Sequence, residues 1–154
     1  MMSKIVVKTV MTVALSLGGS LLLIATADPA DFVRVKVEAA NVRNGPGTEN
    51  DRVLQANENE PLQVISRRDT WLKVRTYDGH QGWIFEALTD DKPAVVVTGT
   101  TVNMRAGPGT DHEVTYTTER GTCFLVLGHR GAWLDVRHES GDRGWIHGSL
   151  VWGN

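Results

Sequence analysis

The eight residues "NVRNGPGT" at 41–48 recur as "NMRAGPGT" at 103–110, a shift of 62 positions. An Arg followed by Gly-Pro-Gly is compatible with two structures, a loop that cradles a phosphate or a turn that reverses the chain. A phosphate loop needs a run of free backbone N–H groups, usually where a helix begins. Pro46 and Pro108 each remove one such donor, and neither a helix pattern nor a Lys-Ser/Thr pair follows. The stretch therefore predicts a chain-reversing turn that occurs twice.

The same shift of 62 positions relates several further motifs. They are Trp71-Leu72 with Trp133-Leu134, Val74-Arg75 with Val136-Arg137, Gly82-Trp83-Ile84 with Gly144-Trp145-Ile146, and Leu88 with Leu150. Between the turn and the first Trp the match is poor. Val53 pairs better there with Val114 than with Thr115, which predicts a shift of one residue. The repeat predicts two units, 28–91 and 92–154, each of which is marginally stable alone.

Alternating apolar and polar residues predict strands in both units. In 33–37 three Val alternate with Arg34 and Lys36, which places the two charged side chains on the outer face. In 71–75 Trp71 lies on the face opposite the core, and its counterpart in the second unit repeats the pattern. No amphipathic helix pattern follows residue 27, and Gly-containing turns separate the short strands. The fold class predicted is all-β, with two tandem small barrels.

Three short segments carry the remaining structural expectations. Gly79 and Gly141 are expected to take positive φ values in hairpins, and Leu88 and Leu150 to close the two cores. The join at 90–95 is short and contains a Pro, so we expect a fixed pairing of the two units.

The first 27 residues have the pattern of a secretory signal peptide. Two Lys precede an uncharged segment at 9–24, and Ala25-Thr26-Ala27 has the form of a cleavage site. The alternative is an uncleaved membrane anchor, because the uncharged run at 9–27 is just long enough to span a bilayer. A Gly-Gly-Ser interruption favours cleavage. We expect a periplasmic or extracellular protein, with 1–27 as signal peptide and no membrane attachment after cleavage.

Composition excludes one class of partner. The 154 residues carry a formal net charge of −2, and 22% of them are charged, which is typical of a globular protein. The basic excess of a nucleic-acid-binding domain is missing, so no nucleic acid partner is expected. The single Cys123 cannot form an intramolecular disulfide, so stability must come from packing.

The ordered set of motifs resembles the bacterial SH3 (SH3b) domain family. Its motifs are N-x-R-x-G-P-G/S-T, W-x-x-V, G-x-x-G-W-V/I and a terminal Leu. The matching segments are 41–48, 71–74, 79–84 and Leu88 in the first unit, and 103–110, 133–136, 141–146 and Leu150 in the second. The resemblance implies two tandem SH3-like barrels in an exported protein. The first unit departs from the family at Asn59-Glu60-Pro61, where the second has Gly121-Thr122, and this predicts a distorted hairpin.

Exposed aromatic and guanidinium groups supply the candidate ligand-binding residues. Trp side chains on a barrel flank stack on sugars or peptides, and Arg binds carboxylates in bidentate fashion. The candidates are Arg43, Trp71, Arg75, Trp83, Arg105, Trp133, Arg137 and Trp145. The alternatives are that the Trp residues cap the barrels, and that the Arg residues buttress the turns or are solvated strand charges.

The sequence also contains residues from which a thiol or a metal site could be built. The residues for a thiol or metal hydrolase are Cys123, His112, His129, His138, His147, Asp111 and Glu113. Their spacings match no standard metal motif, and a small barrel lacks the helix that usually activates a thiol. We therefore expect no catalytic residue, no metal, no cofactor and no enzymatic activity.

The resemblance to the SH3b family implies a non-catalytic secreted envelope protein whose SH3b domains bind peptidoglycan or short peptides, and this is the function that we expect. The alternative is a periplasmic protein–protein interaction adaptor without affinity for the cell wall. The partner is thus peptidoglycan or an envelope protein or peptide, and the oligomeric state stays open.

Overall fold

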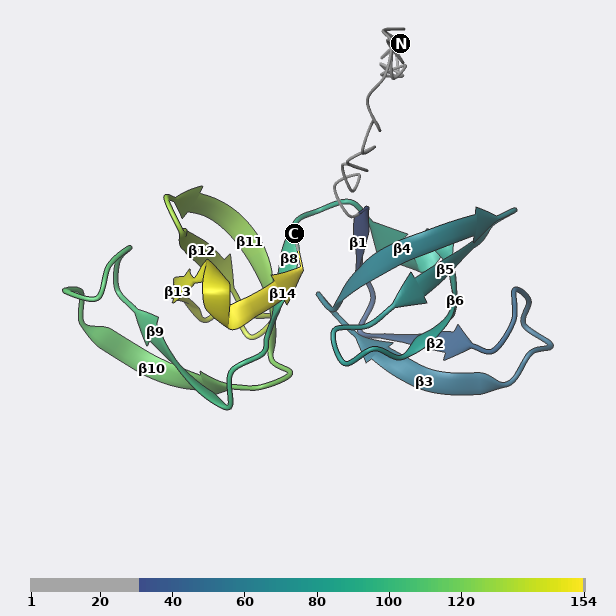
Figure 1. Cartoon of the computed structure of the whole chain (residues 1–154), viewed down its shortest axis with the longest axis horizontal. Coiled ribbons are helices and arrows are strands. Elements are labelled where there is room, and N and C mark those ends of the chain that lie inside the picture. Colours follow the sequence, from purple (N-terminus) through teal and green to yellow (C-terminus); the bar gives the residue numbers. More distant parts are fainter. Residues whose placement is uncertain (1–30, 154) are drawn as a thin grey trace, which may run out of the picture.

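The structure is a computed structural model that describes residues 31–153 (Figure 1). These residues form two sheets of seven antiparallel strands, which lie side by side as two barrels. The all-β prediction is confirmed. The predicted signal peptide, 1–27, lies outside the described residues. Within the described range, no helix is long and apolar enough to cross a membrane.

The first barrel has the strand order β3-β2-β6-β5-β4-β1-β7. Its elements are β1 (Phe32–Val35), β2 (Ala39–Arg43), β3 (Arg52–Asn57), β4 (Pro61–Arg68), β5 (Trp71–Arg75), β6 (Gln81–Phe85), the 3₁₀ helix η1 (Glu86–Leu88) and β7 (Thr89–Asp90).

The second barrel repeats this arrangement in the order β10-β9-β13-β12-β11-β8-β14. Its elements are β8 (Ala94–Val97), β9 (Thr101–Arg105), β10 (Val114–Glu119), β11 (Cys123–Arg130), β12 (Trp133–Arg137), β13 (Arg143–His147), η2 (Gly148–Leu150) and β14 (Val151–Gly153).

The shift of 62 positions holds through the third strand of each barrel, so the predicted one-residue shift is wrong. β3 and β10 have the same burial pattern, in which Ala56 and Thr118 are the buried residues. Val53 and Val114 are both exposed large hydrophobic residues and occupy different positions of this pattern. Because neither Val is buried in a core, the fact that both residues are Val does not indicate how the two strands align. The small buried residue near the end of each strand marks the register instead.

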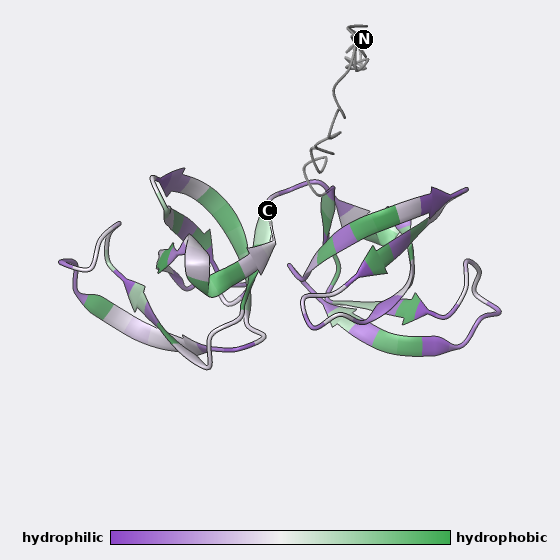
Figure 2. Ribbon diagram, viewed as in Figure 1, coloured by the Kyte–Doolittle hydropathy of each residue, from purple (hydrophilic) through white to green (hydrophobic). Residues whose placement is uncertain are grey.

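Each barrel has its own apolar core, formed by the inward residues of its strands. Green and purple bands alternate along several strands in Figure 2, as expected for strands with one buried face. The first core contains Val33, Val35, Ala40, Val42, Ala56, Leu62, Leu72, Val74 and Ile84. The second contains Val95, Val97, Val102, Met104, Phe124, Val136 and Ile146. Leu88 packs against the first core as predicted, whereas Leu150 is 37% exposed and the expectation for it is wrong.

Arg34 is buried, although the alternation in 33–37 predicts that its side chain lies on the exposed outer face of the first strand. The residue is only 8% exposed, although it alternates with buried Val residues. Its guanidinium donates hydrogen bonds to both carboxylate oxygens of Asp90 on the neighbouring strand β7, at 2.7 and 2.9 Å, and to the side chain of Asn59. A charge can be buried in this way because it is paired and hydrogen-bonded. Its counterpart Val96 is fully buried.

The hairpin between β3 and β4 keeps the geometry of its counterpart, so the predicted distortion is wrong. Asn59 has a φ of 62° where Gly121 has 89°. The backbone N–H of Asn59 donates to the carbonyl of Val35, and that of Gly121 to the carbonyl of Val97, both at 2.9 Å. Asn is among the residues that tolerate the left-handed region, so it replaces Gly here without changing the turn. The positive φ values predicted for the two other hairpin glycines are also confirmed.

The two barrels contact each other, as the short join predicts. The ring of Phe32 on β1 meets the ring of Trp152 on β14 edge to face, with centroids 4.9 Å apart. Strand β14 also contacts β4. In a further contact between the barrels, the guanidinium of Arg120 lies 5.7 Å from the centre of the Tyr77 ring.

Candidate ligand grooves

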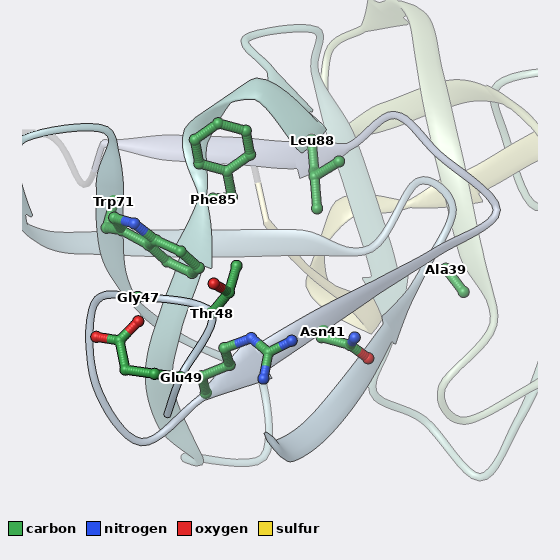
Figure 3. A pocket seen from close by; sticks show the side chains of 9 residues that line it. Ala39, Asn41, Gly47, Thr48, Glu49, Trp71, Phe85 and Leu88 are labelled. Atoms are coloured by element: carbon green, nitrogen blue, oxygen red, sulfur yellow. The ribbon is translucent and has the colours of Figure 1, made fainter. Parts of the chain in front are cut away.

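The first barrel carries a groove of about 470 Å³, called groove one, between the turn at 44–51 and the strands β5 and β6. Its lining residues are Ala39, Asn41, Arg43, Gly47, Thr48, Glu49, Trp71, Phe85 and Leu88. In Figure 3, Phe85 and Leu88 enter from one side, and Asn41 and Glu49 from the other. The groove thus combines aromatic, aliphatic, cationic and anionic groups.

The aromatic wall of groove one follows from strand register. Trp71 and Phe85 are directly opposite each other on β5 and β6, and both point away from the core. Their ring centroids are 5.7 Å apart, within the range of favourable aromatic pairs. Because each ring supports the other, the apolar wall is preformed before any ligand arrives.

Arg43 connects the turn to groove one. Its Nη1 donates a hydrogen bond of 2.7 Å to the backbone carbonyl of Asn50, across the turn that contains Gly-Pro-Gly. This bond fixes the turn, which is the buttressing role that the sequence left open. The same residue lines the groove, so both interpretations of this Arg are compatible with its position.

The second barrel has an equivalent groove of about 300 Å³, called groove two. Its lining residues are Thr101, Val102, Asn103, Arg105, Thr110, Trp133, His147, Ser149 and Leu150. Nη1 of Arg105 donates to the carbonyls of Thr110 and His112, at 3.1 and 2.8 Å. The structure therefore brings Arg43 together with Trp71, and Arg105 together with Trp133, as the sequence predicted.

Groove two differs from groove one in its aromatic wall. His147 takes the place of Phe85, and its ring meets the Trp133 ring edge to face with centroids 5.2 Å apart. Nδ1 of His147 lies 2.7 Å from the Ser149 hydroxyl and accepts a hydrogen bond from the Ser149 backbone N–H. This wall is consequently more polar than its counterpart.

The sequence did not assign Phe85 or His147 to a ligand groove, although a signal for this placement was present. Each follows an inward-facing Ile on its strand, so alternation alone places it on the same outer face as the Trp of the neighbouring strand. The two positions carry different side chains, so they do not belong to the set of identical residues that defines the repeat.

The other four candidate residues lie outside the two grooves. Trp83 and Trp145 are half-buried and stand opposite Arg43 and Arg105 where β2 meets β6 and β9 meets β13. They pack beside the grooves without lining them.

Arg75 and Arg137 share a motif but have different surroundings. Nε of Arg75 donates to the side-chain oxygen of Gln63 at 3.0 Å, across the β4–β5 pair. Arg137 stands opposite Leu125 at the equivalent position of β11, and it lines a separate cleft between the two barrels.

Cys123 has the properties of an unreactive thiol. Burial raises its pKa to about 12, and the nearby carboxylates of Glu60 and Glu139 act in the same direction. The thiolate is the nucleophilic form, and it is almost absent at neutral pH when the pKa is this high. Among residues 31–153, His, Cys, Asp and Glu side chains form no group of three that could hold a metal ion.

Comparison with curated proteins points to the cell wall. The chain is 23% identical over 128 residues to a Bacillus subtilis protein named as a candidate N-acetylmuramoyl-L-alanine amidase, YrvJ, and the match covers 76% of this chain and 24% of that protein. It is 27% identical over 66 residues to the candidate cell wall amidase LytH of Staphylococcus epidermidis, covering 42% of this chain and 23% of LytH. The chain thus spans about a quarter of the length of these relatives.

Solved structures that match part of the chain include an NlpC/P60 family protein from Bacillus cereus. It is 16% identical, with a TM-score of 0.38, and the match covers 80% of this chain and 56% of that chain. NlpC1 from Trichomonas vaginalis is 9% identical, with a TM-score of 0.38, covering 82% of this chain and 47% of that one.

These relatives correct the expectation that the protein is non-catalytic. The curated proteins that match are named as cell wall amidases, so both the non-enzymatic function and the adaptor without affinity for the wall are contradicted. The prediction rested on the motifs of the two barrels. These motifs specify turns and strands, and they give no information about amidase chemistry. The wall context also indicates a location in the envelope or outside the cell.

Family models confirm the resemblance noted from the motifs. A model described as bacterial SH3 domain matches residues 38–90, and a second model with the same description matches residues 98–153. Together the two matches cover most of the described residues, one for each barrel. The chain belongs to the bacterial SH3 domain family and carries two of its domains in tandem.

Proposed function

We propose that this protein acts in peptidoglycan hydrolysis of the amidase type, and that its two SH3 domains hold the wall substrate in grooves one and two. The observation that carries the proposal is the pair of equivalent grooves, each with a Trp and a turn-bound Arg, in a chain related to named wall amidases. The domains extend over 28–91 and 92–154. Export through the segment 1–27 would deliver them to the wall, in the periplasm or outside the cell.

The groups in groove one suit a segment of a wall glycan or stem peptide. The Trp71 and Phe85 rings offer a flat apolar surface for a sugar face or an alanine side chain. Arg43 is held in place by the Asn50 carbonyl, so little side-chain entropy is lost when its remaining N–H groups bind a carboxylate or carbonyl. Glu49 lines the same groove and provides an acceptor for an amide or ammonium group.

Binding to purified peptidoglycan tests the substrate-holding part of the proposal. We expect the full chain to sediment with insoluble peptidoglycan, and Trp71→Ala with Trp133→Ala to weaken retention by about tenfold or more, since large aromatic groups dominate such contacts. The matched control is Ile65→Ala with Leu127→Ala, because these exposed residues occupy equivalent positions outside both grooves. Retention no greater than that of an unrelated β-protein, or equal losses in both double variants, would contradict the proposal.

Hydrolysis is measured separately, by the release of free amino groups from the same wall preparation. We expect release in the presence of the full chain, and a reduced rate for the Trp71→Ala, Trp133→Ala variant that parallels its weaker retention. Release that is unaffected by this variant would show that the grooves do not hold the substrate. Binding without any release would contradict the amidase part alone.

A further inference from the structure

A second kind of pocket lies between the two barrels and shares no residue with either groove. This interdomain cleft has a volume of about 330 Å³. The β3–β4 turn of the first domain and the linker form one side, with Glu58 and Lys92. The end of β12 and the turn after it form the other, with Arg137 and Glu139. The volume is at the lower end of that of ligand pockets, which span roughly 300–1,000 Å³.

Four charged side chains line this cleft without neutralising one another. Lys92 and Arg137 are cationic, and Glu58 and Glu139 are anionic. Among the described residues, none of the four forms an ion pair within 4.0 Å. Arg34 lines the same cleft, but Asp90 and Asn59 already engage its guanidinium. The cleft thus presents two positive and two negative groups with space between them.

The unpaired state of Arg137 has a cause in the sequence. In the first domain, Arg75 occupies the equivalent position and donates to Gln63 on the neighbouring strand. In the second, the cross-strand neighbour is Leu125, which has no acceptor to offer. The exchange of Gln for Leu leaves the guanidinium of Arg137 free to bind a ligand in the cleft.

We propose that the interdomain cleft binds an amino-acid-like zwitterion, a ligand that carries an ammonium and a carboxylate group close together. Arg137 and Lys92 bind the carboxylate through charge-assisted hydrogen bonds, and Glu58 and Glu139 bind the ammonium group. A ligand with both charges satisfies all four side chains, whereas a simple anion or cation leaves two like-charged groups unsatisfied. Residues of both domains complete the site, so it exists only in the tandem arrangement.

The test uses the full chain and the dipeptide alanyl-alanine, followed by backbone-amide NMR. We expect chemical-shift changes at Leu125, His138 and Gly141, which line the cleft, at peptide concentrations up to about 10 mM. N-acetyl-alanyl-alanine retains only the carboxylate, and alanyl-alanine amide only the ammonium group. Each is expected to bind at least about fivefold more weakly, because one pair of charged side chains loses its partner.

The matched variants are Arg137→Gln and Arg75→Gln. We expect the first to weaken dipeptide binding by roughly tenfold and the second to leave it unchanged, since Arg75 is engaged by Gln63 outside the cleft. No shift at the cleft residues, equal binding of the blocked peptides, or equal effects of the two variants would overturn the assignment. Groove one and groove two are unaltered in these variants, so failure here is distinguishable from failure of wall binding.

Discussion

Two glycines at equivalent positions should respond differently to the same substitution. A Cβ added at Gly82 would lie 2.5 Å from a methyl group of Val42 and 2.8 Å from the backbone carbonyl oxygen of Arg43. At Gly144 the nearest atoms would be the carbonyl oxygen of Arg105 at 3.4 Å and the Met104 Cβ at 3.5 Å, which are ordinary contacts. Part of the difference arises because Val is branched at Cβ and Met is not, and part because the backbone carbonyl oxygen of Arg43 lies closer to Gly82 than that of Arg105 lies to Gly144.

We expect Gly82→Ala to destabilise the first domain. Overpacking costs about 1–3 kcal/mol, and the reduced freedom of the unfolded chain offsets about 0.4–1 kcal/mol of it. A net loss near 1 kcal/mol lowers the melting temperature of a domain of this size by about 4–8 °C. Gly144→Ala gains the same offset without a clash, so the free energy of unfolding should stay unchanged or rise by up to about 1 kcal/mol.

Urea unfolding followed by backbone-amide NMR measures both variants, because signals from each domain report its own transition. Replacing Val42 by Met in the Gly82→Ala background should recover part of the loss. Equal destabilisation by Gly82→Ala and Gly144→Ala would refute the reasoning. A Gly82→Ala variant whose first domain has the same free energy of unfolding as the unchanged protein would also refute it.

Three further predictions concern the hairpin, the thiol and the buried ion pair. Gly121→Asn should cost at least about 1 kcal/mol less than Gly121→Val in thermal unfolding, since Asn59 already takes a positive φ at the equivalent position. Alkylation of Cys123 at pH 8 should be at least ~100-fold slower in the native protein than in guanidinium chloride, because burial raises the thiol pKa to about 12; comparable rates would contradict this. Burial alone would raise the pKa of Asp90, but hydrogen bonds from Arg34 and the linker outweigh it and hold the pKa below 3.8. Its stabilising contribution is therefore present above about pH 4 and lost below it, and Asp90→Asn should cost about 2 kcal/mol at pH 7 and flatten the acid limb of the stability curve.

The duplicated motif predicted the fold well because each copy meets the same local requirements. A turn after β2, an alternating WLxVR strand and a Gly-Trp-Ile strand suffice to define one barrel, and their recurrence defines the second. Grooves one and two followed from the same pattern, since Trp71 and Trp133 had to face outward. The alternation of apolar and polar residues along a strand determines on which face of the sheet each side chain lies.

The features that escaped prediction depend on partners far away in the sequence. The burial of Arg34 depends on Asp90, 56 positions later, and alternation alone indicated a solvated charge. Arg75 and Arg137 lie in near-identical motifs, and their different states depend on a single cross-strand neighbour. The similarity to named cell wall amidases could not be predicted from these residues, because the repeated motifs specify only the turns and strands of the barrels.

The contact between Phe32 and Trp152 has a consequence for the order of folding. The two rings come from the first and last strands of the described chain, so their contact has nearly the greatest sequence separation that the molecule allows. Contacts of long sequence separation are slow to form, and domains generally fold as units before they dock. The docking of the two barrels should therefore be the final step. A chain truncated before β14 would retain the first core but lose the pairing of β14 with β8 and the ring contact between the two domains.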